Sequence, residues 1–137
     1  MLSTFKIIGR ISGEEISFKE WYPFNEALEH APTEKGVYCM RFKANICRVK
    51  GESDIAYIGS TNRTLKYRFM GYLHPSKTQR TNTRINLFAK THELEVSFLA
   101  ATPPSLYENL LLDKYYSEHD ELPPLNRAGV EKHHLRP

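Results

Sequence analysis

Three short runs of strand-forming residues constrain the fold of this chain most. They are rich in β-branched and aromatic residues, lie between polar or helix-like stretches, and cover residues 36–42, 55–59 and 94–100. Runs of this length and composition predict β-strands. The helix-like stretches beside them predict an α+β domain with a small, largely antiparallel three-stranded central sheet flanked by helices.

Two helices are expected to flank this sheet. Residues 64–73 form a helical pattern that ends before Pro75. Ser105 is a natural N-cap for the best helix, residues 106–119, which has a mostly apolar face and cannot continue through Pro123-Pro124. Between these helices, residues 75–83 are expected to form a polar loop, while residues 85–89 fit either a helix or a strand.

The first 32 residues are expected to extend this core. Residues 5–11 and 16–18 predict a hairpin with Ser12-Gly13 as its turn, and residues 23–30 predict a short helix that stops before Pro32. A chain of 137 residues has the size of one ordinary domain. We therefore expect a single domain (1–137) made of an N-terminal extension (1–32), a core (33–127) and a mobile tail (128–137).

The distribution of charge is more informative than the modest net charge of +3. Between Ile55 and His92 there are no acidic residues and seven basic ones, so this segment carries +7 and the rest of the chain, with 12 basic and 16 acidic residues, carries −4. A concentrated positive field of this kind attracts a polyanion. On charge alone, a solvated basic face without a partner is an equal alternative. The basic residues are Arg63, Lys66, Arg68, Lys77, Arg80, Arg84 and Lys90.

The composition indicates a globular protein without a membrane partner. Apolar residues make up 40% and charged residues 26% of the chain, and Lys6 and Arg10 interrupt the N-terminal apolar residues, so we expect neither a signal peptide nor a spanning helix. Two cysteines, Cys39 and Cys47, are too few for a disulfide framework. The sequence allows them to face each other across a hairpin, but we expect reduced thiols in a cytoplasmic protein.

Two tripeptides in the predicted strands carry a family resemblance. Gly36-Val37-Tyr38 and Tyr57-Ile58-Gly59 resemble the motifs that name the GIY-YIG endonuclease family. Further family elements follow in the family's order, so the resemblance covers residues 36–126, about two thirds of the chain. The 18 residues between Tyr38 and Tyr57 exceed the usual link, which we interpret as an insertion at a hairpin tip. The further elements are Ser60, Arg68, Tyr72, Glu108 and Asn126.

The resemblance implies a metal-dependent hydrolase of phosphodiesters, with Arg68 and Glu108 as its charged groups. A guanidinium stays charged and matches two phosphate oxygens, so Arg68 would stabilise the transition state. Its alternative is an ordinary phosphate contact or a solvent-exposed charge. Glu108 would bind Mg²⁺, or Mn²⁺ in its place, since Mg²⁺ accepts a single protein carboxylate. Its alternative is a capping box with Ser105, which fits the pattern S-x-x-E.

Three tyrosines complete the implied catalytic set. Tyr38 and Tyr57 are candidates for accepting a proton from water, and we favour Tyr38 as the base, with Tyr57 bridging water and phosphate. A phenol has a pKa near ~10, which a nearby arginine and metal would lower. Tyr72, four residues after Arg68, would share its helical face and contact the same phosphate. For all three the alternative is packing in the core.

The remaining site residues are expected to contact the substrate or support the site. Asn126 would orient either the backbone or the surroundings of Glu108, and a structural role is as frequent for such a residue as a chemical one. Gly59 would let the chain approach the substrate closely or turn tightly. Contacts to backbone phosphates position a protein without specifying sequence, so we expect weak sequence preference unless a homodimer or a partner supplies it. The expected substrate-binding residues are Gly59, Ser60, Arg63, Lys66, Lys77, Arg80 and Arg84.

Three functions are therefore compared. The favoured hypothesis is an endonuclease that cuts DNA. The second is a catalytically inactive nucleic-acid-binding module that uses the same basic face, and the third is a small interaction domain whose basic run only keeps it soluble. The complete set of arginine, glutamate and tyrosines favours the first, because a pure binder needs no carboxylate facing phosphate.

Overall fold

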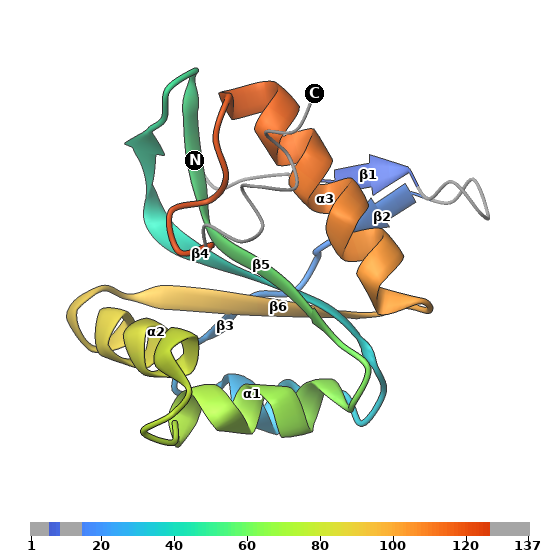
Figure 1. Ribbon diagram of the computed structural model, residues 1–137, viewed down its shortest axis with the longest axis vertical. Helices are drawn as coiled ribbons and strands as arrows, with labels where there is room; N and C mark the ends of the chain where they lie inside the picture. Colours follow the sequence, from blue (N-terminus) through green and yellow to red (C-terminus); the bar gives the residue numbers. More distant parts are fainter. Residues whose placement is uncertain (1–5, 9–14, 127–137) are drawn as a thin grey trace.

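An open four-stranded antiparallel sheet forms the centre of the computed structural model, which describes residues 6–8 and 15–126 (Figure 1). The strand order is β3-β6-β4-β5. The expected α+β class and all three expected strands are confirmed. The sheet has one strand more than expected, because Tyr22 and Pro23 pair with Val96 and Glu95. The strands are β3 (Tyr22–Pro23), β4 (Gly36–Cys47), β5 (Glu52–Thr61) and β6 (Leu94–Ala100).

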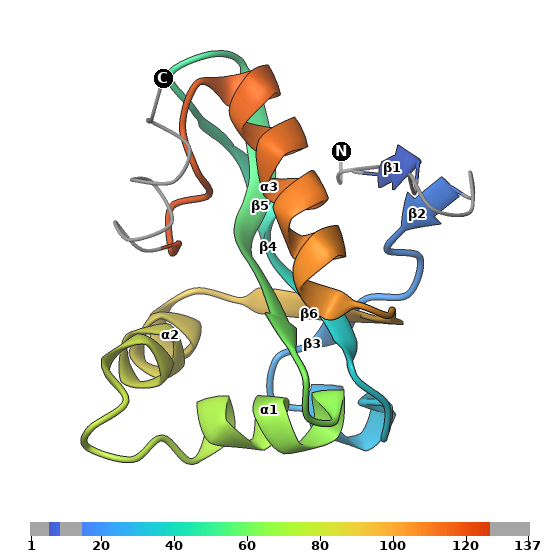
Figure 2. The ribbon, with the colours of Figure 1, turned by 45° about the vertical axis from the view of Figure 1, so that its right-hand side comes forward.

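Helices cover both faces of this sheet. Figures 1 and 2 show α1 and α3 on opposite sides of the long β4–β5 pair, with α2 beside α1. The expected start of α1 is confirmed, because the Thr64 hydroxyl accepts a hydrogen bond from the Tyr67 backbone N–H at 3.0 Å. The helices are α1 (Leu65–Leu73), α2 (Arg80–Thr91), α3 (Pro104–His119) and the 3-10 helix η1 (Ala27–His30).

Alternation along β4 divides the core into two layers. Val37 and Cys39 pack with α3, whereas Tyr38 and Met40 pack with α1, α2 and η1. Successive side chains of a strand point to opposite faces, so one slip in register would exchange the two layers. The tyrosine of the first tripeptide therefore faces α1.

The two tripeptides lie side by side in this sheet. Tyr38 pairs with Gly59 of β5 and with Phe98 of β6. Gly36 sits where β4 and β6 approach closely, since a Cβ there would lie 2.2 Å from the Leu99 carbonyl oxygen. The register and this close contact explain why the first tripeptide begins with glycine.

The long link between the tripeptides is an ordered hairpin arm. Most of it continues β4 and β5, and its tip turns at Gly51, whose φ of +71° suits glycine. Arg48 forms an ion pair with Glu121 at 2.9 Å and donates a hydrogen bond to the Leu122 carbonyl at 2.7 Å. The tip is thereby fixed to the chain just after α3.

Two expectations about helix ends were wrong. The expected loop at 75–83 ends before Arg80, because α2 begins there. Residues 85–89, which fitted either a helix or a strand, lie within this helix. Ser105 is not an N-cap: α3 begins at Pro104, and its N-cap, Pro103, makes no side-chain capping bond. Proline suits a first helical position because its φ is already helical and no N–H is left unpaired.

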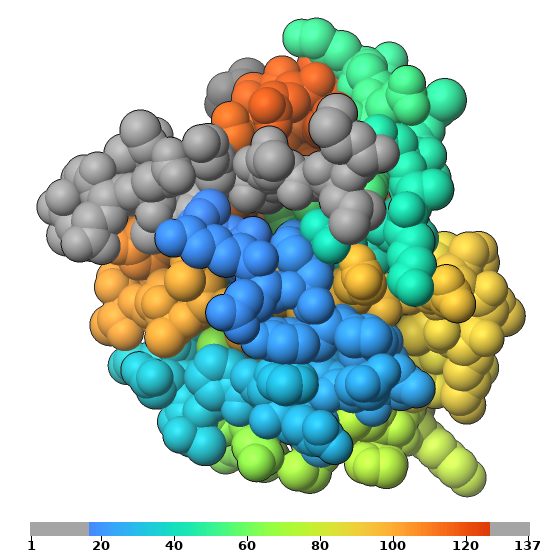
Figure 3. All heavy atoms as spheres, turned by 180° about the vertical axis from the view of Figure 1, so that it is seen from behind, coloured from blue at the N-terminus to red at the C-terminus, as the bar shows by residue number. Residues whose placement is uncertain are grey.

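The described N-terminal residues add a hairpin and a covering segment. β1 (Lys6–Ile8) pairs antiparallel with β2 (Glu15–Ser17), as expected, while the expected turn at Ser12-Gly13 and the expected tail at 128–137 lie outside the described residues. Phe18 packs with the α3 layer and Phe24 with the α1 layer. Figure 3 shows the part of this segment that follows β2, in blue, across the middle of one face of the molecule.

The two cysteines do not face each other. Both lie on β4 and are free thiols, Cys39 buried and Cys47 exposed, so the arrangement across a hairpin that the sequence allowed does not occur. They cannot be opposite each other because both lie on the same strand.

No helix among the described residues combines the length and the apolar character needed to cross a membrane.

Candidate active site

Four predicted site residues meet between β4, β5 and α1. The hydroxyl oxygens of Tyr38 and Tyr72 are 2.6 Å apart, and Nη2 of Arg68 donates to the Tyr72 hydroxyl at 2.9 Å. The ring of Tyr57 lies 6.1 Å from that of Tyr38 and 6.4 Å from that of Tyr72. We call Tyr38, Tyr57, Arg68 and Tyr72 the tyrosine–arginine cluster.

Local folding explains why these side chains converge. Arg68 and Tyr72 are one turn apart on α1, so they share a face of the helix, as expected from their spacing. The Tyr38 ring comes from β4, on the face that α1 covers. Gly59 makes room for it, because a Cβ there would lie 2.6 Å from the Tyr38 hydroxyl and 2.9 Å from the Tyr57 ring.

Burial divides the cluster into an inner and an outer pair. Tyr38 is 2% exposed and Tyr72 is fully buried, whereas Tyr57 and Arg68 are partly exposed. The Tyr72 hydroxyl is bonded to both Tyr38 and Arg68 inside the protein. The inner pair therefore holds the guanidinium, and the outer pair is what a ligand can reach.

The electrostatics of the inner pair differ from the expectation. Burial raises the pKa of Tyr38 and of Tyr72 well above 10, and the nearby Arg68 charge only partly opposes this rise. Burial also disfavours the charged form of Arg68, but the neighbouring tyrosines reverse this effect and raise its pKa. Arg68 thus keeps its charge, while the predicted shift of Tyr38 towards phenolate is absent.

These shifts predict a loss of stability in alkali. Because folding raises the pKa of Tyr38, the neutral phenol of Tyr38 adds to the free energy of unfolding. This contribution is complete below the unfolded pKa of about 10 and is lost as the pH rises through the pKa of the folded state. Urea unfolding at a series of pH values should show that, above about pH 10, the free energy of unfolding falls less with pH in Tyr38→Phe than in the wild type. The control is Tyr67→Phe at an exposed position, in which the free energy of unfolding should fall with pH as it does in the wild type. Equal falls in both variants would contradict a role for Tyr38 in the loss of stability.

Asn82 joins the cluster and was missed by the sequence analysis. It is 2% exposed, and its Oδ1 accepts a hydrogen bond from Nη1 of Arg68 at 3.1 Å. Its Nδ2 donates to Oε1 of Gln79 at 3.2 Å. Arg68 is therefore held from two sides, by Tyr72 and by Asn82. The signal that could have found it, a polar residue on the apolar stripe of α2, depended on recognising that helix.

Asn82 should affect turnover of any reaction that uses Arg68. In Asn82→Ala the guanidinium loses one of its two holding bonds, so we expect kcat to fall by about tenfold to 100-fold with KM little changed. The matched control is Asn86→Ala on the same helix, whose amide donates to the Tyr72 and Leu73 carbonyls rather than to Arg68. Initial-rate assays give kcat and KM, and thermal unfolding gives the stability of each variant. Asn86→Ala should lose stability and keep its kcat; equal kcat losses in both variants would contradict a positioning role for Asn82.

Glu108 comes from the opposite layer, on α3. It is partly exposed and has neither a hydrogen-bond nor an ion-pair partner among the described residues. The capping-box alternative is wrong, because Ser105 is inside the helix rather than at its N-cap. No group of three or more His, Cys, Asp or Glu side chains gathers within the described part of the chain. A single unpaired carboxylate of this kind still fits Mg²⁺, which retains most of its waters.

Asn126 supports β5 beside Tyr57. Its Oδ1 accepts from the Ile58 N–H at 3.2 Å and its Nδ2 donates to the Ile58 carbonyl at 3.0 Å. The Leu125 N–H also donates to the Ala56 carbonyl at 3.0 Å. Asn126 thus binds the backbone of β5, and this segment fixes the peptide groups on both sides of Tyr57, while the part that Asn126 plays in the site stays a prediction.

The predicted substrate-binding side chains are of two kinds, those that are partly covered by the protein and those that are exposed. Ser60 is partly exposed at the end of β5, and Arg84 is partly buried with its guanidinium donating to the Leu125 carbonyl. Arg84 thus supports the segment that holds β5. The exposed basic residues are Arg63, Lys66, Lys77 and Arg80.

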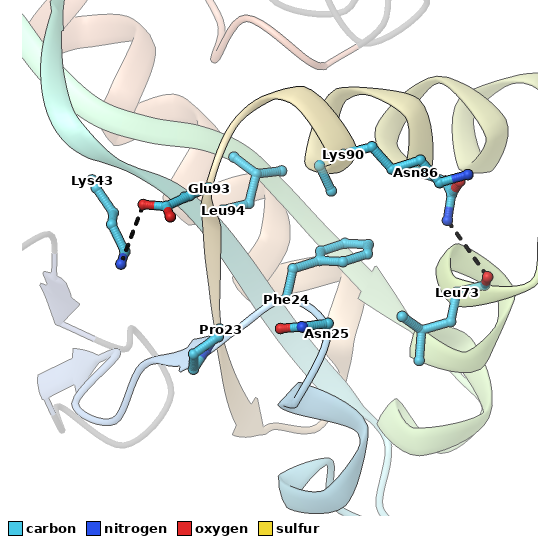
Figure 4. Close-up of a pocket in the computed structure, with 10 residues that line it drawn as sticks. Pro23, Phe24, Asn25, Lys43, Leu73, Asn86, Lys90, Glu93 and Leu94 are labelled. Atoms are coloured by element: carbon cyan, nitrogen blue, oxygen red, sulfur yellow. Dashed lines mark hydrogen bonds and ion pairs between the residues drawn. The ribbon is translucent and has the colours of Figure 1, made fainter.

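A pocket of about 430 Å³ lies outside the cluster, between β6, α2 and the segment before η1 (Figure 4). None of its lining residues belongs to the tyrosine–arginine cluster. Two contacts between polar groups lie at its wall, Lys43 with Glu93 at 3.4 Å and the Asn86 amide with the Leu73 carbonyl. The pocket is therefore separate from the cluster.

Comparison with known proteins finds solved structures that are similar to this fold. Neither a scan against protein-family models nor a search of curated proteins finds a match. Among solved structures, a tyrosine-to-phenylalanine variant of the GIY-YIG N-terminal endonuclease domain of UvrC from Thermotoga maritima, bound to the catalytic divalent cation, is 26% identical with a TM-score of 0.50, covering 76% of this chain and 94% of that one. The magnesium-bound domain of the same protein is 22% identical with a TM-score of 0.49, covering 76% and 96%. The structure thus confirms the resemblance that the two tripeptides carry: the chain has the fold of the GIY-YIG endonuclease family.

Proposed function

We propose that this protein is a metal-dependent endonuclease that hydrolyses DNA phosphodiester bonds at the tyrosine–arginine cluster. The observation that carries the proposal is the convergence of Arg68 with the side chains of three tyrosines from three separate elements. Structural packing alone gives no reason to hold a guanidinium between Tyr72 and Asn82 with one side left open. A fixed positive charge on an accessible surface suits a phosphate that gains negative charge during hydrolysis.

The division of the cluster suggests a role for each tyrosine. A general base must reach water, and Tyr57 is the partly exposed member, whereas Tyr38 and Tyr72 are buried with raised pKa values. We therefore assign proton acceptance or water orientation to Tyr57 and revise the earlier preference for Tyr38. Tyr38 and Tyr72 would hold Arg68 in place.

Glu108 is the proposed protein ligand of the cation, Mg²⁺ or Mn²⁺. Its carboxylate has no partner within the described residues, and α3 packs mainly against β5, the strand that carries Tyr57. A bound divalent cation would supply Lewis-acid stabilisation of the phosphate and its leaving oxygen. The reach of Glu108 towards the cluster stays a prediction.

DNA is the proposed substrate, held by phosphate contacts from the exposed basic residues in and beside α1 and α2, which are Arg63, Lys66, Lys77 and Arg80. A homodimer stays a prediction. The alternative function is an inactive module that binds nucleic acid through the same basic face, and the acid-free segment from Ile55 to His92 supports both. The unpaired Glu108 carboxylate favours the enzyme, because it would repel phosphate unless a cation lay between them.

Cleavage of a supercoiled plasmid separates these two functions. The nuclease should convert the plasmid to nicked or linear forms in Mg²⁺ or Mn²⁺ and stop in EDTA. The binding module should retard the plasmid on a gel in a salt-sensitive way and leave it intact with every divalent cation. The second result would remove the enzymatic proposal.

A further inference from the structure

The outer face of α1 combines exposed apolar and basic side chains. Among the described residues, four large hydrophobic side chains are exposed, and two of them, Tyr67 at 58% and Met70 at 44%, are three residues apart on this helix. Residues at this spacing are neighbours on a helix surface. Exposed aromatic and methionine side chains side by side need a reason that a solvated helix does not give.

Positive charge surrounds this pair. The Arg63 guanidinium lies over the Tyr67 ring, 4.5 Å from its centroid, and Lys66 is exposed on the adjacent position of the helix. The helix belongs to the segment from Ile55 to His92 that has no acidic residue. We call Arg63, Lys66, Tyr67 and Met70 the outer face of α1. Its charge excludes a cationic or basic partner and favours a polyanion with flat apolar groups.

The outer face of α1 borders the tyrosine–arginine cluster. Tyr67 directly precedes Arg68 in the chain, and Gly71 lies one turn after Tyr67. Gly71 carries no side chain, and a Cβ there would lie 3.9 Å from Nη1 of Arg68. The nearest atom to that Cβ would be Nδ2 of Asn82, at 3.0 Å, so α2 contacts α1 at this point. Tyr67 and the guanidinium therefore lie on adjoining parts of the α1 surface, beside the contact with α2.

We propose that the outer face of α1 binds unpaired nucleotides next to the scissile phosphate, with bases stacked on Tyr67 and Met70 and phosphates held by Arg63 and Lys66. This inference rests on the proposed nuclease function and names its substrate class: DNA with a single-stranded segment at the cleavage site. Every unpaired base offers a face for stacking, and such stacking tolerates any sequence.

A fully paired duplex fits this surface less well. In a duplex the base faces are covered by their neighbours, and the backbone is contacted by charged and hydrogen-bonding side chains, among them the tyrosine hydroxyl. The Tyr67 ring and the Met70 side chain would then have no base face to contact, and only the Tyr67 hydroxyl would serve duplex binding. The combination on α1 is that of surfaces that bind single strands, where a basic groove and aromatic side chains act together.

The test measures binding without cleavage. Fluorescence anisotropy in EDTA compares two labelled DNA probes, a duplex with a single-stranded overhang and a fully paired duplex of equal length. We expect Tyr67→Ala to raise the Kd for the overhang by about tenfold, since base–aromatic stacking is worth about one such factor or more. The Kd for the paired duplex should change little, and Tyr67→Phe, which keeps the ring, should bind as the wild type does.

Leu87→Ala on α2 is the matched control, because Leu87 has the same exposure as Tyr67, 58%, and lies in the same basic segment. It should leave both Kd values unchanged. Equal effects of Tyr67→Ala and Leu87→Ala on the overhang probe would overturn the inference, as would equal weakening of both probes by Tyr67→Ala, which would indicate duplex binding. Overhang binding that depends on Tyr67 without any plasmid cleavage would remove the nuclease proposal and keep the single-strand surface.

Discussion

Replacing Arg68 with alanine should lower kcat for phosphodiester cleavage by about 100- to 1000-fold, because it removes the fixed positive charge nearest the proposed phosphate site. The side chain is held by Tyr72 at 2.9 Å and by Asn82 at 3.1 Å, so its position is set before a substrate binds. Such preorganised charge contributes most to a transition state in which negative charge increases. The measurement is the initial rate of plasmid nicking in Mg²⁺ at saturating DNA.

Two variants separate charge from geometry and from binding. Arg68→Lys keeps the charge without the two-pronged guanidinium, so it should recover only a small part of the lost rate. Lys90→Ala removes an exposed positive charge of the same basic segment, so it should weaken DNA binding and reduce the salt dependence without lowering kcat. Wild-type kcat in Arg68→Ala, with unchanged thermal unfolding, would exclude Arg68 from the chemistry.

The sequence predicted the parts of the site that depend on short-range regularity. The four-residue spacing of Arg68 and Tyr72 placed them on one face of α1, and their hydrogen bond confirms it. The strand patterns around Tyr38 and Gly59 placed the tripeptides on neighbouring strands, and their direct pairing confirms that too. In the first case the helical period alone fixes the geometry, and in the second the hairpin connection between consecutive strands brings them together.

What the sequence could not predict depends on contacts between distant segments. The burial of Tyr38 requires α1 to cover that face of β4, and burial rather than the nearby arginine decides its pKa. Asn82 could be assigned to the site only because the structure shows that residues 80–91 are helical and pack on α1. The extra strand at Tyr22 is two residues long, too short for any pattern, and exists because β6 offers it an edge.

Replacing Glu108 with glutamine should reduce Mg²⁺-dependent cleavage by about 100-fold or more, because a neutral amide keeps the shape of the side chain but loses the charge that attracts the cation. Stability should stay the same. In the structure Glu108 has no hydrogen-bond or ion-pair partner among the described residues. It also does not cap α3, which begins at Pro104 with no side-chain capping bond. Replacing the carboxylate with an amide therefore removes no contact that stabilises the fold.

Glu118→Gln is the matched control on the same helix. Glu118 is exposed and forms a 3.6 Å ion pair with Lys114, a surface contact that contributes little, so this variant should cleave DNA as the wild type does. Cleavage rates across a series of Mg²⁺ concentrations, together with Mn²⁺ binding followed by electron paramagnetic resonance, give two independent readouts. If Glu108→Gln kept both the rate and the bound Mn²⁺ of the wild type, the metal would have to be held elsewhere and the proposed role of α3 would be wrong. If it lost bound Mn²⁺ and rate together while Glu118→Gln lost neither, the carboxylate on α3 would be tied to the chemistry at Arg68 on the opposite side of the sheet.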